Sequence, residues 1–318
     1  MKKKVLLLVL VTFLTFSLTG CTTYLKDDDG KNVREETTGQ TLTENILCQP
    51  TNKDVIKTYK KNGVDISELP KCDDFTPASG GYSGLWETLF VKPLSWVIIK
   101  LGTLLHNYGW AIILVTILIR LIIFPISRKS ALQSENMKFA QKDLEKLENK
   151  YRHRDSQEDQ MLKAQEMMAI YKKYEINPLS GCLFAFIQLP LFLVFLESLN
   201  RLPIIFEGDF LGFNLGTTPS TAILSNGNWL YLILPILVAL TTFFSFKLNS
   251  GMSANSEEQQ KQLRMTMNIM LIFIVISSFV MPTSIIVYWI TGSLFTIIQG
   301  QLIRRAKENG SSKKRIKK

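Results

Sequence analysis

The second half of the chain alternates between long apolar blocks and shorter polar segments. Several blocks run for about 17 to 20 residues, the length that a helix needs to cross the hydrocarbon core of a bilayer. A helix also satisfies its own backbone hydrogen bonds there. We predict membrane-spanning helices at residues 109–126, 178–199, 229–247, 265–281 and 285–303. The predicted fold class is therefore an all-α polytopic membrane protein with five spans.

The segment at 127–177 is too polar to enter a bilayer, because it holds eleven Lys or Arg and nine Asp or Glu up to residue 175. Apolar side chains recur in it at heptad spacing, first from Met137 to Tyr151 and again from Met161 to Tyr171. Two helices with this spacing pair along their apolar faces. We predict a helical hairpin that ends before Pro178, since the residue preceding a proline disfavours the helical conformation.

Residues 83–108 show an amphipathic pattern, in which tryptophans and leucines are interrupted by Glu87, Lys92 and Lys100. Tryptophans and spaced lysines are typical of a helix that lies in the membrane interface. The alternative is a further span beginning at Pro93, which would carry Lys100 into hydrocarbon. We therefore favour an outer interfacial helix.

Charge sets the expected orientation. The net charge is +10, and Lys and Arg gather at 127–177, in the loop 248–264 and in the tail 304–318. Under the positive-inside rule these segments are cytoplasmic, so the loop 200–228 and the mature N-terminus lie outside and the C-terminus lies inside. The basic excess comes without a nucleic-acid-binding motif, which favours a membrane surface as its partner.

The N-terminus has the features of an export signal. Residues 1–20 hold three lysines, an apolar core and small residues, followed directly by Cys21. This order is that of a secretory signal peptide, and the sequence Leu-Thr-Gly-Cys at its end resembles a bacterial lipobox. We predict cleavage before Cys21 and a covalent lipid on its side chain. An uncleaved helix is the alternative, although its apolar core of about a dozen residues is short for a span.

The segment 21–82 is polar and lacks a sustained apolar period. Such composition is typical of an exported tether or of a small, loosely ordered module. Cys48 and Cys72 both lie in it, and an oxidising compartment would let them form a disulfide. Their spacing leaves the pairing open.

Arg120 is the sharpest chemical feature, because it lies inside the first predicted span. An arginine there costs about 2.5 to 3.5 kcal/mol on insertion scales, and such residues usually serve a function. Glu197 is the acidic residue of the predicted spans, and it lies near the opposite end of its helix, about 28 Å from the inner side against about 9 Å for Arg120. We expect the guanidinium to meet water, carbonyl groups or an incoming anionic segment. The alternative is that it snorkels to the inner headgroups.

Catalysis and metal binding find little support in the sequence. His106 and His153 fall on opposite sides of the predicted membrane, and neither stands at ligand spacing from a cysteine. No nucleotide-binding motif is present. We expect a protein that is not an enzyme and that uses no metal and no cofactor, apart from the lipid on Cys21.

Three motifs resemble those of the YidC/Oxa/Alb membrane protein insertases. They are the run Gly109 to Arg120, the run Asn177 to Cys182 leading to Gln188-Leu189-Pro190, and the pair Tyr288-Trp289. The resemblance covers about residues 83 to 305, and the lipobox resembles that of the Gram-positive branch. Residues 22 to 80 lie outside it.

The resemblance implies an insertase and chaperone for integral membrane proteins that needs no nucleotide. Its spans would surround a hydrophilic groove open to the cytoplasm and to lipid, with Arg120, Gln188 and Trp289 in contact with substrate. Nascent membrane proteins and membrane lipid would be the partners, and the hairpin and basic tail would receive substrates or contact the ribosome and the Sec translocon. The alternative for the tail is ordinary positive-inside charge. The rival readings are a transporter with Arg120 as its anion site, although the sequence shows no internal repeat, and a structural lipoprotein scaffold.

Overall fold

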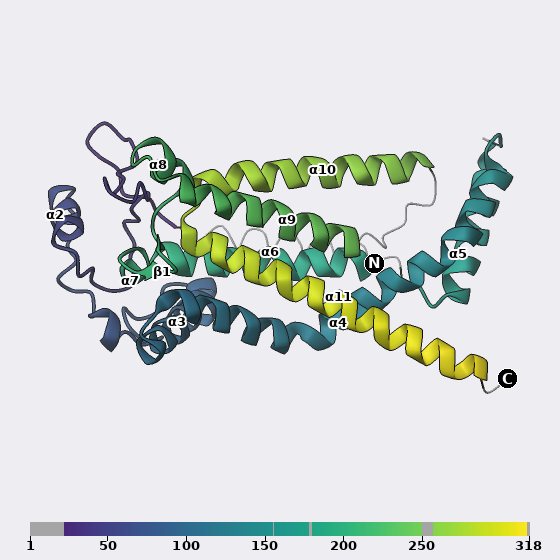
Figure 1. Cartoon of the computed structure of the whole chain (residues 1–318), viewed down its shortest axis with the longest axis horizontal. Coiled ribbons are helices and arrows are strands. Elements are labelled where there is room, and N and C mark those ends of the chain that lie inside the picture. Colours follow the sequence, from purple (N-terminus) through teal and green to yellow (C-terminus); the bar gives the residue numbers. More distant parts are fainter. Residues whose placement is uncertain (1–21, 155, 178–179, 250–256, 317–318) are drawn as a thin grey trace. The chain divides into compact units, whose positions relative to one another are not determined.

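The computed structural model describes residues 22–154, 156–177, 180–249 and 257–316 (Figure 1). The predicted signal peptide at 1–20 and the predicted lipidation site Cys21 lie outside the described residues. Much of the predicted loop 248–264 does so as well.

Helices dominate the described residues, with one short antiparallel strand pair. The elements are α2 (Lys53–Lys61), η2 (Cys72–Asp74), η3 (Glu87–Val91), α3 (Lys92–Leu105), α4 (Tyr108–Tyr151), α5 (Gln157–Lys173), α6 (Ser180–Asn200), α7 (Pro203–Phe206), β1 (Asp209–Phe210), β2 (Phe213–Asn214), α8 (Pro219–Leu224), η4 (Trp229–Leu232), α9 (Ile233–Asn249), α10 (Glu257–Val280) and α11 (Thr283–Ile316).

Among the described residues, four helices are long and apolar enough to cross a membrane. They are Glu87–Leu105, Tyr108–Gln133, Trp229–Leu248 and Thr283–Ala306. Two shorter apolar helices, Gln188–Asn200 and Met265–Val280, overlap the predicted spans 178–199 and 265–281. The structure therefore shows a mostly helical protein with several membrane-spanning candidates. The segment predicted as an interfacial helix meets the length and apolarity of a span, so these two criteria do not separate the two readings of that segment.

The chain forms two compact units, and several helices pass from one unit into the other. The first unit holds the described residues of Met1–Thr116 together with Pro190–Pro235 and Ser278–Trp289. The second unit holds Ile117–Leu189, the described residues of Ile236–Ser277, and those of Ile290–Lys318.

Residues 22–82 of the first unit pack around an apolar core, whereas the sequence predicts a tether or a loosely ordered module. The buried side chains of this core come from α2, from α7 and from the irregular segments before and after α2. They are Leu25, Leu42, Ile46, Val55, Tyr59, Ile66 and Phe206. The hydroxyl of Tyr59 donates a 2.7 Å bond to the Thr43 carbonyl. Val55 and Tyr59 stand one helical turn apart on α2, but the other apolar residues are scattered among polar ones, so the sequence shows no sustained period. We call residues 22–82 the N-terminal module.

The hairpin belongs to the second unit, and α4 enters it without a break (Figure 1). The sequence pattern predicts that the span ends at residue 126 and the hairpin begins at 127, but α4 is one helix of 44 residues with Pro125 inside it. Charges mark where a helix leaves the membrane and do not end the helix. Ser156 caps the N-terminus of α5 by accepting a bond from the backbone N–H of Asp159.

The hairpin is held by a small core and by ion pairs at its surface. Its buried residues are Ala140, Leu144, Tyr171 and Ile176. Lys150 pairs with Glu166, Lys163 with Glu148, and Lys173 with Asp143. Apolar spacing brings α4 and α5 together, and the ion pairs lie along the seam.

Candidate functional site

Arg120 lies on α4 within the second unit and is half-buried. Its guanidinium lies against α11 at Gly292. A Cβ atom built on Gly292 would stand 2.8 Å from Nη2 of Arg120, closer than real Cβ contacts. The side of α11 that faces the guanidinium is therefore bare backbone, and the space next to it exists because residue 292 is glycine.

A second contact joins the same two helices seven residues further along each. Gln299 of α11 donates a 2.9 Å hydrogen bond from Nε2 to Oγ of Ser127 on α4. The Ser127 hydroxyl donates in turn to the Phe124 carbonyl at 3.1 Å. Residue numbers rise together along both helices from one contact to the next, so α4 and α11 run parallel here.

Gln188 and Trp289 are the other two residues predicted to contact substrate. Gln188 is half-buried on α6 in the second unit. Trp289 belongs to the first unit, where its ring packs edge-on against Phe192 with ring centroids 5.3 Å apart. Its neighbour Tyr288 is buried and stacks on Phe195 at 4.1 Å. The structure thus gives Trp289 a packing partner on α6 within its own unit.

The first unit holds a buried charge network that the sequence pattern does not indicate. Nη1 of Arg201 donates a 2.7 Å bond to the Glu87 carboxylate, and Lys92 lies 3.7 Å from the same carboxylate. Lys92 is only 2% exposed and Arg201 only 3%. Nζ of Lys92 also donates to the carbonyls of Ser79 and Gly81. Two charges that the sequence places on a polar helix face are thereby enclosed in protein.

The same network reaches α6 and the N-terminal module. The indole N–H of Trp86 donates a 3.0 Å bond to Oε1 of Glu197. Nε of Arg201 donates to the Asn45 carbonyl at 2.6 Å, and the Arg201 carbonyl accepts from the N–H of Leu47 at 2.9 Å. The end of α6 is therefore tied to η3 and to the N-terminal module at once. Arg201 falls just beyond an apolar run, and a cation at such a place is the signal that could have drawn attention to it.

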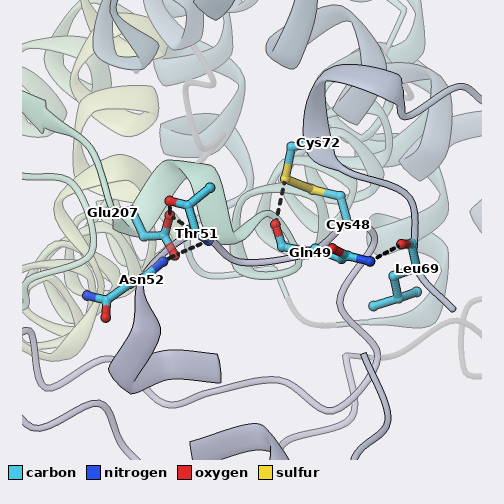
Figure 2. The surroundings of a disulfide bond; sticks show 7 residues. All are labelled: Cys48, Gln49, Thr51, Asn52, Leu69, Cys72 and Glu207. Carbon is cyan, nitrogen blue, oxygen red and sulfur yellow. Dashed lines mark hydrogen bonds between the residues drawn. A yellow bond between two sulfur atoms is a disulfide. The ribbon is translucent and has the colours of Figure 1, made fainter. Parts of the chain in front are cut away.

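Figure 2 shows a further anchor of the N-terminal module beside a disulfide. Cys48 and Cys72 are bonded, with their Cα atoms 4.8 Å apart. In the segment between Cys48 and α2, the backbone N–H groups of Thr51 and Asn52 donate to the Glu207 carboxylate, at 2.9 Å and 2.8 Å. The disulfide thus closes the loop 48–72, and Glu207, the residue after α7, holds that loop close to its start. Within the described residues, no group of three or more His, Cys, Asp or Glu could hold a metal ion.

Comparison with known proteins identifies the family. A family model described as 60Kd inner membrane protein matches residues 100–311. The membrane protein insertase YidC of Oceanobacillus iheyensis is 35% identical over 233 residues, which cover 72% of this chain and 87% of that protein. The membrane protein insertase MisCA of Bacillus subtilis is 37% identical over 229 residues, which cover 72% of this chain and 82% of that protein.

A solved structure described as an active YidC insertase with its first transmembrane domain resolved aligns with 77% of this chain and 50% of that chain. The identity is 20% and the TM-score 0.42. The family match begins after the N-terminal module and includes α4, α6 and α11. Since the match spans most of the chain and the relatives are covered over most of their length, the chain belongs to the 60Kd inner membrane protein family, that of the YidC membrane protein insertases.

Proposed function

We propose that this protein is a membrane protein insertase that helps integral membrane proteins enter the bilayer and fold there, without using a nucleotide. Family membership supports the activity, since the relatives carry that name. The observation that carries the proposal is the placement of Arg120, a cation within an apolar helix with bare backbone of α11 beside it.

The proposed topology has five spans, with the N-terminal module outside and the C-terminus in the cytoplasm. The parallel course of α4 and α11 supports it, because two spans can point the same way only if an odd number of crossings lies between them. The apolar helices α6, α9 and α10 supply three such crossings. In this topology α3 lies in the outer interface, and Lys and Arg gather on the cytoplasmic side.

At the outer end of the chain we propose a lipid anchor. Cleavage before Cys21 and acylation of its thiol would hold the N-terminal module at the membrane surface. The mass of the mature N-terminal peptide measures this directly.

The mechanism follows from the cost of moving polar groups into hydrocarbon. The spans would enclose a groove open to the cytoplasm and to lipid, in which Arg120, with Gln188 and water, lowers the cost of desolvating a short polar or acidic segment of the substrate. The apolar part of the substrate then moves into lipid past Trp289. That step releases roughly 25 cal/mol per Å² of apolar surface removed from water, so partitioning supplies the driving force.

The hairpin and the basic tail are the proposed contact sites for the ribosome and for the Sec translocon. The hairpin exposes ion pairs and apolar side chains, among them Met161, which is 62% exposed, and Met168, which is 57% exposed. Exposed methionines adapt to varied partners.

Insertion of a single-span substrate into proteoliposomes tests the role of Arg120. We expect Arg120→Ala to slow insertion of a substrate with an acidic exported tail several-fold, and Arg120→Lys to slow it less, because the charge is kept. A substrate whose tail is neutral should respond weakly to both. Insertion of the acidic substrate at the wild-type rate by both variants would refute the electrostatic role.

Crosslinking from position 121 to a stalled nascent chain distinguishes an insertase from a transporter and from a structural scaffold. An insertase should capture the nascent chain, whereas a transporter or a scaffold should not.

A further inference from the structure

The geometry points to Gly292 as the residue that positions Arg120: the missing side chain at this position lets the guanidinium lie against α11, and the Ser127 to Gln299 bond holds the two helices in that register. This inference rests on the proposed function, in which Arg120 meets the substrate.

Space, and not backbone conformation, accounts for the glycine. Glycine is less favourable than alanine inside a helix, so its presence there asks for a reason. Gly292 lies within the regular helix α11 and is absent from the glycines with positive φ, so any residue could adopt its backbone conformation. The reason for the glycine is therefore the lack of space for a Cβ atom at this position.

The atoms nearest to that Cβ all belong to Arg120. They are Nη2 at 2.8 Å and Cζ and Nε at 3.6 Å. A glycine that serves only to bring two helices together would instead have the backbone of the other helix closest to the added carbon. Gly300, two turns further along α11, has nothing within 4 Å of its built Cβ. The two glycines share one helix, and only Gly292 lies against a functional side chain.

The expected response to a methyl group at Gly292 is a displaced guanidinium and not a broken fold. The closest atom is the far end of a flexible side chain, which can swing away at little cost. The helices stay in register, because Ser127 and Gln299 bond at a separate place. The guanidinium then occupies a different position in the proposed groove.

The test compares Gly292→Ala with Gly300→Ala as its matched control, in the same proteoliposome assay with acidic and neutral tails. We expect Gly292→Ala to slow insertion of the acidic substrate about threefold or more, within the range of couplings between residues in contact, and to leave the neutral substrate nearly unchanged. Gly300→Ala should match the wild type on both.

A double variant provides the decisive measurement. If Gly292 acts through Arg120, Gly292→Ala should cost nothing further in an Arg120→Ala background. Equal fold-losses from Gly292→Ala in both backgrounds would show a packing role and overturn the inference. The inference also fails if Arg120→Ala slows insertion while Gly292→Ala does not. If Arg120→Ala itself has no effect, the proposed function and the inference fall together.

The amount of each variant in the membrane distinguishes slow insertion by a folded protein from loss of the fold. Should Gly292→Ala fail to accumulate while the double variant accumulates normally, the damage comes from the clash with Arg120 and the inference stands. Depletion of both variants would overturn it.

Discussion

Charged side chains have different surroundings in the first unit and at the α4–α11 contact of the second unit. In the first unit, the Glu87 carboxylate accepts from Arg201 and lies beside Lys92, and Arg201 also bonds the backbone of the N-terminal module. In the second unit, the Arg120 guanidinium lies next to Gly292, which has no side chain. In the first arrangement a carboxylate lies between two cations, and in the second the absence of a Cβ atom lets a guanidinium lie against a neighbouring helix. Substitutions in the two places should therefore affect different measurements.

The largest expected effect is on the stability of the first unit. Glu87→Gln removes the negative charge that Arg201 and Lys92 share, and both cations remain buried. Removing one partner from a buried ion pair typically costs about 3 to 5 kcal/mol. We expect a lower thermal midpoint in detergent and faster proteolysis of the N-terminal module. Asp54→Asn is the control, because Asp54 pairs with Lys57 at the surface and such pairs contribute at most about 1 kcal/mol. Equal midpoints for the two variants would contradict the assignment.

A smaller effect is expected from the disulfide. Replacing Cys48 and Cys72 together by serine opens a loop with a sequence separation of 24, for which the loss is about 2 to 4 kcal/mol. The loss should be confined to the N-terminal module and appear as faster hydrogen exchange over residues 22–82. Insertion of the acidic substrate should stay near the wild-type rate. A variant that exchanges like the wild type but inserts poorly would reverse the comparison between the two units.

The smallest expected effect is a loss of hairpin stability at low pH. Hydrogen bonds from Lys150, the larger contribution, and from Tyr151 lower the pKa of Glu166 below its ordinary value of 4.5. The carboxylate therefore favours the folded hairpin above pH 4.5, and that contribution is lost as the pH falls through the lowered pKa. Hydrogen exchange along α5 should stay constant from pH 7 to 5, once corrected for its intrinsic pH dependence, and then show extra opening in stronger acid. Glu166→Gln should weaken this acid response without removing it, because a bond from Lys173 also lowers the pKa of Asp143 and joins α5 to α4 in the same way. An unchanged response in the variant would assign it to other groups.

The long apolar helices and the two hairpin helices could be predicted from the sequence because apolar length and heptad spacing report local structure directly, whereas the short helices α2, α7 and α8 were not predicted. Arg120 stood out for the same reason, as a charge within an apolar run. Family membership followed from the motifs around Arg120, Asn177 and Trp289, and the comparisons confirm it.

The parts that escaped prediction depend on contacts between distant segments. Glu87 and Lys92 match the polar face of an interfacial helix in the sequence, but Glu87 bonds Arg201, more than a hundred residues away, and Lys92 bonds the carbonyls of Ser79 and Gly81. The core of the N-terminal module takes Phe206 from another part of the chain. The role of Gly292 emerges only when α4 is placed beside α11. Amino-acid patterns along one segment carry no information about such partners.

The unbroken course of α4 gives it a mechanical property. At about 1.5 Å per residue, its 44 residues form a rod of roughly 66 Å that carries Arg120 near one end and the hairpin core at the other. No loop intervenes to absorb a push or a pull. A displacement of the hairpin by a bound partner therefore reaches Arg120 through continuous helix, and Pro125, which lies between the two, is the position where that helix bends most easily.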